Sequence, residues 1–367
     1  MRHATALPHR LPTAALPSIA LPSIALVAIA LVAIGLVAIG LLGLPAVAAP
    51  TGKPAFTDPA HTDADFPFQG EYAGTIAVGG EAGPVGVQVI ALGDGAFDVV
   101  AYPGGLPGDG WSPPDKIQGR GVREGDGQAA GVKVEALDLG GTLRRGRIKD
   151  GALVVLSESG AELARLPKAA RTSPTLGDPP PPGAVQIFSG LDGNRDISRL
   201  AEARVSEDGL LMEGATTKDS FGDAVWHIEF RLPYQPQDRG QGRGNSGAYV
   251  QGAYEVQMLD SFGLDGKSNE CGGIYSVAAP FVNMCLPPLA WQTYDIDFKA
   301  AAHEGDTQVK PARMTVRHNG VVIHDAVEVA KTTPGGKPGP APGRGPLHLQ
   351  NHGNPVRYRN IWVLPKP

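Results

Sequence analysis

The chain has 367 residues, with 50 glycines, 34 prolines and only 6% aromatic residues. This content of Gly and Pro excludes a fold built mainly from helices of ordinary length and indicates short strands separated by turns. The net charge of -5 is small, and Lys and Arg are dispersed along the chain, which argues against a nucleic-acid-binding surface. We therefore expect an all-β protein that is long enough for two domains.

Residues 1–48 have the pattern of a signal peptide. The start is basic, residues 19–44 are almost wholly apolar, and Ala46-Val47-Ala48 has the small residues that signal peptidase recognises. We expect cleavage near Ala48 and a periplasmic or secreted protein. The apolar run is also long enough to cross a bilayer, so an uncleaved membrane anchor stays open as the alternative.

Shifts in composition divide the rest of the chain into four segments. Residues 49–65 are small, polar and Pro-containing, which is typical of a linker. Residues 66–170 contain Gly-punctuated strand patterns and predict a small antiparallel β domain of unknown role. Residues 171–183 end in a polyproline run and predict a stiff second linker, and residues 184–367 predict a second β domain.

The only two cysteines of the chain are Cys271 and Cys285. In an oxidising compartment, two cysteines this close in sequence indicate a disulfide that closes one loop. No companion His or Cys completes a metal-ligand set around them. We therefore predict a Cys271–Cys285 disulfide.

One strand carries the clearest chemical pattern in the sequence. Residues 254–258 alternate, so that Tyr254, Val256 and Met258 point to one side and Glu255 and Gln257 to the other. This pattern predicts a strand with an apolar core face and a polar face that carries a carboxylate. The chain turns directly after this strand, so Asp260 could curl back over the polar face as a second carboxylate.

Two further patterns concern neighbouring strands. Residues 224–232 place His227 and Glu229 opposite an apolar row, and we favour charge pairing across strands over a ligand-facing role for this polar row. Asn319-Gly320 predicts a type I′ hairpin turn. His318 lies beside that turn, and we expect it to be exposed and outside any site.

Seven segments of the second domain resemble the 3-keto-disaccharide hydrolase domain family, a jelly-roll sandwich akin to concanavalin-like lectins and bacterial glucanases. They occur in the family's order, at residues 243–247, 254–260, 273–275, 291–295, 318–320, 349–353 and 357–361. The resemblance implies an all-β chain in which a concanavalin-like jelly roll follows the small antiparallel β domain. The two-domain arrangement also resembles that of planctomycete-type exported proteins.

The resemblance implies an exported enzyme that cleaves the glycosidic bond of a 3-keto glycoside. The C3 carbonyl acidifies the C2 proton, so a base can remove it, the C1 substituent can leave, and water can then add. On this basis Glu255 is the candidate base and His352 the candidate acid, and Asn245 and Gln257 are donors for sugar hydroxyls or the enolate. Asp260 is a second carboxylate or a ligand for a cation.

Three further residues in or beside the matched segments complete the predicted site. Arg243, Tyr275 and Gln350 are candidate substrate contacts for a carbohydrate or keto-sugar. A carboxylate-rich site with His352 nearby could hold a hard divalent cation such as Ca²⁺ or Mn²⁺, although no ligand spacing demands one.

The central strand also resembles a degraded form of the endoglucanase pattern Glu-x-Asp-x-x-Glu. Gln257 replaces the middle Asp, and Asp260 replaces the last Glu. The loss of the central carboxylate and the shorter final acid argue against double displacement on ordinary glucans. Elimination needs no nucleophile and stays compatible with these residues.

Several alternatives stay open. Glu255 could pair with Arg243 or Arg359 across the sheet, and His352 before a glycine could be a turn residue that bonds the backbone. The whole domain could be a non-catalytic, lectin-like carbohydrate-binding module, because the same fold hosts lectins and enzymes. A third alternative is an interaction module in a cell-surface complex.

Overall fold

The computed structural model describes residues 53–78, 81–138, 143–337 and 341–367. The predicted signal peptide and its cleavage site lie outside these residues. In the described ranges, no helix has the length and apolar character needed to span a membrane. The helices found there are three single 3-10 turns, η1 (Phe66–Phe68), η2 (Gly127–Ala129) and η3 (Gly240–Gly242), so the all-β prediction is confirmed.

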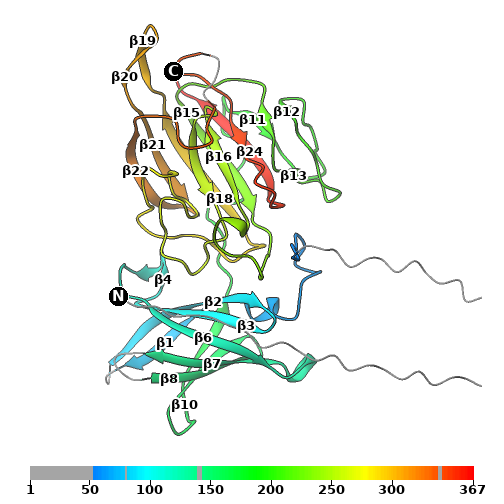
Figure 1. The fold of residues 1–367 in the computed structure, drawn as a ribbon, viewed down its shortest axis with the longest axis vertical. Helices are drawn as coiled ribbons and strands as arrows, with labels where there is room; N and C mark the ends of the chain where they lie inside the picture. The colour runs from blue at the N-terminus through cyan, green and yellow to red at the C-terminus, as the bar shows by residue number, and fades with distance from the viewer. Residues whose placement is uncertain (1–52, 79–80, 139–142, 338–340) are drawn as a thin grey trace, which may run out of the picture. The chain divides into compact units, whose positions relative to one another are not determined.

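The first half of the described chain forms a closed eight-stranded antiparallel barrel with strand order β1-β10-β9-β8-β7-β6-β3-β2 (Figure 1). Its strands are β1 (Gly70–Val78), β2 (Glu81–Gly93), β3 (Ala96–Pro103), β6 (Ile117–Glu124), β7 (Gly131–Asp138), β8 (Leu143–Lys149), β9 (Ala152–Leu156) and β10 (Glu162–Ala169). The two short strands β4 (Leu106–Pro107) and β5 (Gly110–Trp111) form a separate parallel pair.

Alternating apolar side chains fill the barrel. Val85, Val87 and Val89 of β2 are all buried in the barrel core. The turn between β2 and β3 takes the left-handed backbone at each of its residues, with φ values of 85° at Gly93, 55° at Asp94 and 78° at Gly95. Gly tolerates this conformation, and Asp adopts it more readily than most residues, so the sequence is suited to the tight reversal.

The second half forms a sandwich of two sheets. The larger sheet runs in the order β11-β24-β15-β18-β21-β22, and β13 adds to β24. Its strands are β11 (Val185–Phe188), β13 (Leu211–Met212), β15 (Ala224–Arg231), β18 (Trp291–Lys299), β21 (Ala312–His318), β22 (Val321–Val329) and β24 (Arg357–Pro365).

The smaller sheet of the sandwich runs in the order β12-β14-β23-β16-β17. Its strands are β12 (Leu200–Ala201), β14 (Thr216–Thr217), β16 (Ser246–Val250), β17 (Tyr254–Met258) and β23 (His348–Leu349), and a separate hairpin pairs β19 (Ala302–Glu304) with β20 (Thr307–Lys310). Trp226 and Phe230 of the larger sheet share one core cluster with Val256 and Met258 of the smaller sheet. The apolar face predicted for residues 254–258 is therefore the core face.

The hairpin between β21 and β22 has the predicted type I′ turn, because Asn319 and Gly320 both have positive φ values, 49° and 78°. The prediction that His318 is exposed was wrong, since its side chain is fully buried. The last residue of β21 points into the core, where its ring contacts Tyr294 and its Nε2 lies 2.9 Å from Gln292 Oε1. Burial lowers the pKa of His318 to about 3.

The barrel and the sandwich belong to one compact unit of the described chain. Phe56 pairs with Tyr234 through two backbone hydrogen bonds of 2.9 Å. Arg243 of the sandwich donates from Nη1 to the carbonyl of Ala91 on β2 at 3.1 Å. The polypeptide before and within the barrel therefore contacts the loop that leads into β16.

The predicted disulfide is absent from the structure, where Cys271 and Cys285 are buried free thiols. Each sulfur has a partner of its own. Cys271 Sγ lies 3.3 Å from Tyr294 Oη, and Cys285 Sγ lies 3.5 Å from the carbonyl of Leu259. The two thiols also interact with each other, since the hydrogen bond between them contributes to the pKa of both. The predicted neighbourhood of the two cysteines is therefore present, but the covalent bond is not.

The polar row of β15 pairs across strands, as predicted. His227 Nδ1 lies 2.6 Å from Asp295 Oδ1 on β18, and Arg359 of β24 donates from Nε to Glu229 Oε2 at 2.7 Å. His227 and Glu229 are fully buried, and the backbone amide of Gly177 donates to Glu229. The segment around residue 177 therefore covers this polar row, which the sequence pattern did not indicate.

Candidate functional site

The register of two antiparallel strands places Glu255 beside Tyr249. Strand β16 pairs with β17, so that Tyr249 lies opposite Glu255 and Gly247 lies opposite Gln257. Residues directly opposite each other in an antiparallel pair share one face of the sheet. We call this surface, formed by Gly247, Tyr249, Glu255, Gln257, His348 and Gln350, the Glu255 face. It is turned away from the apolar core formed by Val256 and Met258.

The Glu255 carboxyl lies directly over Gly247. A Cβ atom at that glycine would lie 2.2 Å from Glu255 Oε1, which is far inside van der Waals contact. The absence of a side chain at residue 247 therefore makes the space that the carboxyl occupies. The backbone amide of Glu255 is held separately by the hydroxyl of Thr333, at 3.0 Å.

Glu255 is only 2% exposed, and this burial raises the pKa of its carboxyl to about 7. A hydrogen bond from the Tyr249 hydroxyl acts in the opposite direction and lowers that pKa. The neighbouring arginines do not neutralise Glu255, because Arg243 pairs with Asp260 and Arg359 pairs with Glu229. The predicted alternative of an ion pair between Glu255 and one of these arginines was therefore wrong.

Tyr249 is a polar neighbour of Glu255 on the opposite strand. Burial raises the pKa of its phenol, and the negative charge of Glu255 raises it further, so the phenol stays protonated. Its hydroxyl lies 3.0 Å from the carbonyl of Pro334 and accepts a hydrogen bond of 3.3 Å from Gln350 Nε2. Tyr249 therefore has one proton and two acceptors, the Glu255 carboxylate and a backbone carbonyl.

Amide side chains extend the polar face beyond Glu255. Gln257 Nε2 and Asn245 Nδ2 both donate to Gln241 Oε1 at 3.1 Å, which joins the predicted substrate contacts Asn245 and Gln257 through a third amide. Gln241 lies in η3, within the Gly-rich loop that precedes β16. This loop therefore contributes a side chain of its own to the polar face.

Two buried acceptors in this region have no partner in the structure, Asn245 Oδ1 and Gln350 Oε1. An unpaired buried carbonyl oxygen costs free energy, and a hydroxyl donor from a ligand would recover it. Sugar hydroxyls are donors of this kind. Tyr275, His348 and Gln350 are half-buried, so they are the side chains around Glu255 that solvent reaches most.

Both the backbone and the phenol of Tyr275 lie near the Glu255 face. Its amide donates to the carbonyl of Glu255 at 3.1 Å, which adds residues 274–275 beside β17. Its phenol is near enough to Tyr249 to contribute to the raised pKa of that residue. Of the eight residues that the sequence placed in the site, five lie together: Glu255, Gln257, Asn245, Gln350 and Tyr275.

Asp260 and Arg243 lie elsewhere, paired with each other. Arg243 Nε is 2.5 Å from Asp260 Oδ2, and both side chains are almost fully buried. Asp260 is therefore neutralised by Arg243 and does not curl back over Glu255. The two residues line a cavity against the barrel, which is described below.

His352 is exposed on the loop after β23. Among the described residues, no hydrogen bond or ion pair joins its ring to another side chain. The ring that does lie beside Tyr249 belongs to His348, at 6.0 Å between centroids. Burial lowers the pKa of His348, and its Nδ1 lies 2.8 Å from the hydroxyl of Thr216. His348 is therefore neutral near pH 7.

The described side chains do not fit a Ca²⁺ or Mn²⁺ site. In this part of the chain, no group of three His, Cys, Asp or Glu side chains is arranged to hold an ion. The predicted ligand Asp260 is used by Arg243, and Glu255 is surrounded by a phenol and amides rather than by further carboxylates. We derive no catalytic step through a metal.

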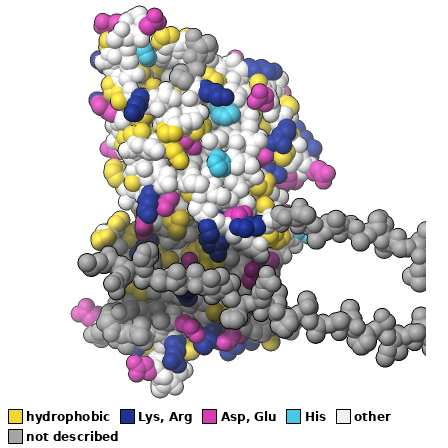
Figure 2. All heavy atoms as spheres, in the orientation of Figure 1, with side chains coloured by type: hydrophobic (Ala, Val, Ile, Leu, Met, Phe, Trp, Pro, Cys, Tyr) yellow, Lys and Arg dark blue, Asp and Glu magenta, His cyan; other side chains and the backbone are white. Residues whose placement is uncertain are grey.

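Figure 2 shows basic and acidic side chains intermixed over the visible face of the described residues. This face therefore carries no broad field of one sign.

The sequence prediction missed Tyr249, Gln241 and His348. Tyr249 could have been found by extending the alternation of residues 254–258 backwards across the turn at Gln251-Gly252, because the pairing then sets it opposite Glu255. His348 pairs with Tyr249, which lies 99 positions earlier in the chain. It belongs to a strand of only two residues, which is too short for an alternating pattern to predict it.

Comparison with known proteins identifies relatives of the sandwich. Residues 185–364, from β11 into β24, match the family model described as the 3-keto-alpha-glucoside-1,2-lyase-like domain. A crystal structure from Parabacteroides distasonis, described as a "putative glycosyl hydrolase", is 32% identical over 51% of this chain and 85% of that chain, with a TM-score of 0.45.

Two further crystal structures from the same organism are described in the same words. Each is 17% identical, and they cover 49% and 50% of this chain and 98% and 94% of their own, with TM-scores of 0.34 and 0.36. Among curated proteins, none matches this chain. The resemblance of the barrel to planctomycete-type proteins stays a prediction.

Proposed function

Because the chain belongs to the 3-keto-alpha-glucoside-1,2-lyase-like domain family, we propose that it cleaves the glycosidic bond of 3-keto glycosides at the Glu255 face. The observation that carries the proposal is the state of Glu255. Its carboxyl is buried, has no counter-charge and has a pKa raised to about 7. A general base works best when its pKa lies near the working pH.

In the proposed reaction, the Glu255 carboxylate removes the proton from C2 of the sugar. The electrons of that C–H bond form an enolate with the C3 carbonyl. They then form the C1–C2 double bond as the bond from C1 to the leaving oxygen breaks. Water adds across this double bond in a second step, so the products are a 3-keto sugar and the released alcohol. The net reaction is hydrolysis, and no oxidant or nucleophile of the protein is consumed.

The enolate needs hydrogen-bond donors aimed at the C3 oxygen. The phenol of Tyr249 serves this role, because its raised pKa keeps it protonated. Its one proton, which is donated to the carbonyl of Pro334 in the structure, turns to the C3 oxygen when the sugar is bound. Gln350 Nε2 donates to the Tyr249 hydroxyl at 3.3 Å and thereby makes that phenol a better donor. The unpaired oxygens of Asn245 and Gln350 accept hydrogen bonds from sugar hydroxyls.

The leaving oxygen needs a proton. Glu255 holds that proton after the first step, and with a pKa near neutrality it can release it again. In an α-glucoside the C2 proton and the C1 oxygen lie on opposite faces of the ring, so the proton reaches the leaving oxygen through water. His352 was the acid in the sequence-based hypothesis, but its exposed position gives it no contact with Glu255. We therefore assign both proton transfers to Glu255. We further propose that the protein acts after export, as residues 1–48 indicate.

A Glu255→Gln variant tests this function against a lectin-like one. Gln keeps the size of the side chain and its hydrogen bond with Tyr249 but cannot accept the C2 proton. We expect turnover of a 3-keto glucoside to fall by at least ~10²-fold, while binding of the same sugar is retained. Turnover that survives in the variant would contradict the role of Glu255. Wild-type protein that binds the sugar without cleaving it would make the domain a carbohydrate-binding module.

A further inference from the structure

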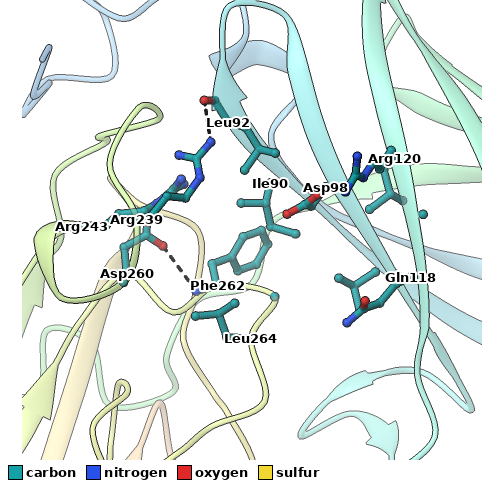
Figure 3. A pocket seen from close by; sticks show the side chains of 15 residues that line it. Ile90, Leu92, Asp98, Gln118, Arg120, Arg239, Arg243, Asp260, Phe262 and Leu264 are labelled. Atoms are coloured by element: carbon teal, nitrogen blue, oxygen red, sulfur yellow. Dashed lines mark hydrogen bonds and ion pairs between the residues drawn. The ribbon is translucent and has the colours of Figure 1, made fainter. Parts of the chain in front are cut away.

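A cavity lies between the barrel and the sandwich. It has a volume of about 380 Å³ and is lined by residues of β2, β3 and β6 on one side and by the 239–243 and 260–264 loops on the other (Figure 3). This volume is within the range of about 300–1,000 Å³ that is usual for small-molecule sites. None of the residues that define the Glu255 face lines it.

One wall of the cavity contains a buried cation with an unused donor. Arg243 is 4% exposed, its Nε pairs with Asp260, and its Nη1 donates to the carbonyl of Ala91. Its Nη2 is buried and has no partner in the structure. A buried guanidinium nitrogen without an acceptor is costly, and an oxygen of a bound molecule would satisfy it.

The charges around the cavity favour an anion. Asp260 is neutralised by Arg243, which leaves Asp98 as the remaining carboxylate of the lining against the guanidinium groups of Arg120 and Arg239. Figure 3 shows Arg239 beside Arg243, with Asp98 and Arg120 across the cavity. Burial lowers the pKa of Arg239, and the positive charge of Arg243 lowers it further. A carboxylate between these two arginines would relieve that repulsion.

The rest of the lining is not suited to a bare inorganic anion. Ile90, Val100 and Phe262 give it a buried apolar part, and Gln118 and Asp98 are exposed hydrogen-bonding groups on the barrel strands. The C–H face of a sugar ring packs on apolar side chains, and its hydroxyls donate to groups such as the Asp98 carboxylate. The lining thus combines a cationic end, an apolar floor and hydroxyl partners.

We propose that this cavity binds a sugar acid of monosaccharide size, with its carboxylate on Arg239 and Arg243 and its ring against Phe262 and Ile90. The site is separate from the Glu255 face and does not depend on the reaction proposed for it. It gives the contact between barrel and sandwich a ligand-binding role.

Titration of the purified protein with glucuronate, followed by calorimetry, tests the proposal. We expect saturable binding of glucuronate and none of glucose or inorganic phosphate at the same concentrations. Arg239→Gln should weaken binding by about tenfold or more, since it removes a charge-assisted contact with the carboxylate. Arg120→Gln should weaken it less, because Arg120 lies across the cavity and contributes only its positive charge. Arg120 is exposed, but Arg239 also donates to the carbonyls of Leu92 and Pro236, so the melting temperature of each variant is measured beside its binding. Arg317→Gln, which removes an exposed arginine outside the lining, is the matched control and should bind as the wild type does.

Four results would overturn the proposal. Glucuronate could fail to bind, or it could bind equally well to both arginine variants. Inorganic phosphate could bind as tightly as glucuronate, which would indicate a simple anion site. Glu255→Gln separates this site from the catalytic one, because glucuronate binding should be unchanged in that variant. Loss of glucuronate binding in it would place the sugar acid on the Glu255 face and contradict the proposal.

Discussion

At the scale of single residues, burial rather than a specific charge gives Glu255 its chemistry. Its carboxyl has a pKa of about 7 because it is desolvated and lacks a cationic partner. Asp260, only five positions later, is paired with Arg243 and does not share this environment. Two carboxylates that appear equivalent in the sequence therefore differ in what they can do, and only Glu255 is suited to proton transfer.

The raised pKa of Glu255 sets the pH dependence of the reaction. A base acts only when it is deprotonated, so kcat/KM should rise with pH and level off above the pKa of about 7. The measurement is kcat/KM for a 3-keto glucoside from about pH 5 to about pH 9, with the spontaneous elimination subtracted at each pH. A profile that falls across this range would show that the essential group must be protonated, which excludes Glu255 as the base.

Local strand periodicity predicted some of the site residues but not their long-range partners. The alternation of residues 254–258 was sufficient to place Glu255 and Gln257 on a polar face, because strand periodicity is local. The pairing of Arg243 with Asp260 was not accessible, because it depends on how the 239–245 loop folds back across the end of β17. His318 was mistaken for an exposed residue, since a hairpin turn next to it says nothing of which way the strand's last side chain points.

At the scale of the elements, the β16–β17 hairpin positions the Glu255 carboxyl through the missing side chain at Gly247. A methyl group there would meet Glu255 Oε1 at 2.2 Å, and the flexible carboxyl rather than the backbone would have to move. Gly247→Ala should therefore lower kcat by about tenfold or more, because small displacements of a catalytic group are costly.

Thermal unfolding separates this effect from a loss of structure. The melting temperature of Gly247→Ala should stay close to that of the wild type, and sugar binding should persist. The nearby Gly240, at which a Cβ would meet nothing within 4 Å, provides the comparison, although its φ of 52° adds strain to a substitution. Full activity of Gly247→Ala would mean that the position of the carboxyl is not controlled by this contact.

The contact of His227 on β15 with Asp295 on β18 sets how the stability of the protein depends on pH. Burial lowers the pKa of His227, but Asp295 and Glu229 outweigh burial and raise that pKa from 6.5 to about 9. A group whose pKa is raised on folding stabilises the protein fully below its unfolded pKa. The contribution is lost as the pH rises through the folded value. The protein should thus lose stability between about pH 6.5 and about pH 9, by about 3 kcal/mol at most.

The measurement is the urea unfolding free energy of the wild type and of His227→Gln at several pH values in this window. The variant lacks the titrating ring and should show a much smaller decline. Equal slopes in the two proteins would assign the alkaline loss of stability to other groups. At acid pH, Glu229 changes stability in the opposite direction, because folding lowers its pKa from 4.5 to about 2. The stability that Glu229 contributes is fully present above about pH 4.5 and is lost as the pH falls through about 2.

The closure of the barrel could not be predicted from the sequence. Strand patterns and Gly-rich turns indicated most of the barrel strands, but strand signals alone do not say whether a sheet closes on itself. Closure depends on the pairing of β1 with both β2 and β10, which joins residues about 100 positions apart. The predicted disulfide is a different case, because the spacing correctly indicated that Cys271 and Cys285 are neighbours but does not determine whether they are oxidised.

At the scale of the whole molecule, the Arg243–Asp260 pair connects the barrel to the sandwich. Arg243 neutralises Asp260 in the sandwich and donates to the carbonyl of Ala91 in the barrel. Replacement by Met leaves the Asp260 carboxylate buried without a partner, which costs about 3–5 kcal/mol. Urea unfolding of Arg243→Met near neutral pH measures this loss, and the exposed Arg317→Gln should change stability by no more than about 0.5 kcal/mol. Equal stability of wild type and Arg243→Met would show that the pair is not a structural link.

The proposed reaction begins when the protein removes the C2 proton of a 3-keto glycoside. The most direct test compares the purified protein on a 3-keto glucoside, on the same compound with deuterium at C2, and on the unoxidised parent glucoside. We expect cleavage of the keto sugar, slower cleavage of the deuterated one and no cleavage of the parent, which lacks an acidic C2 proton. Equal cleavage of the keto sugar and its parent, or no cleavage of either with sugar binding retained, would contradict it.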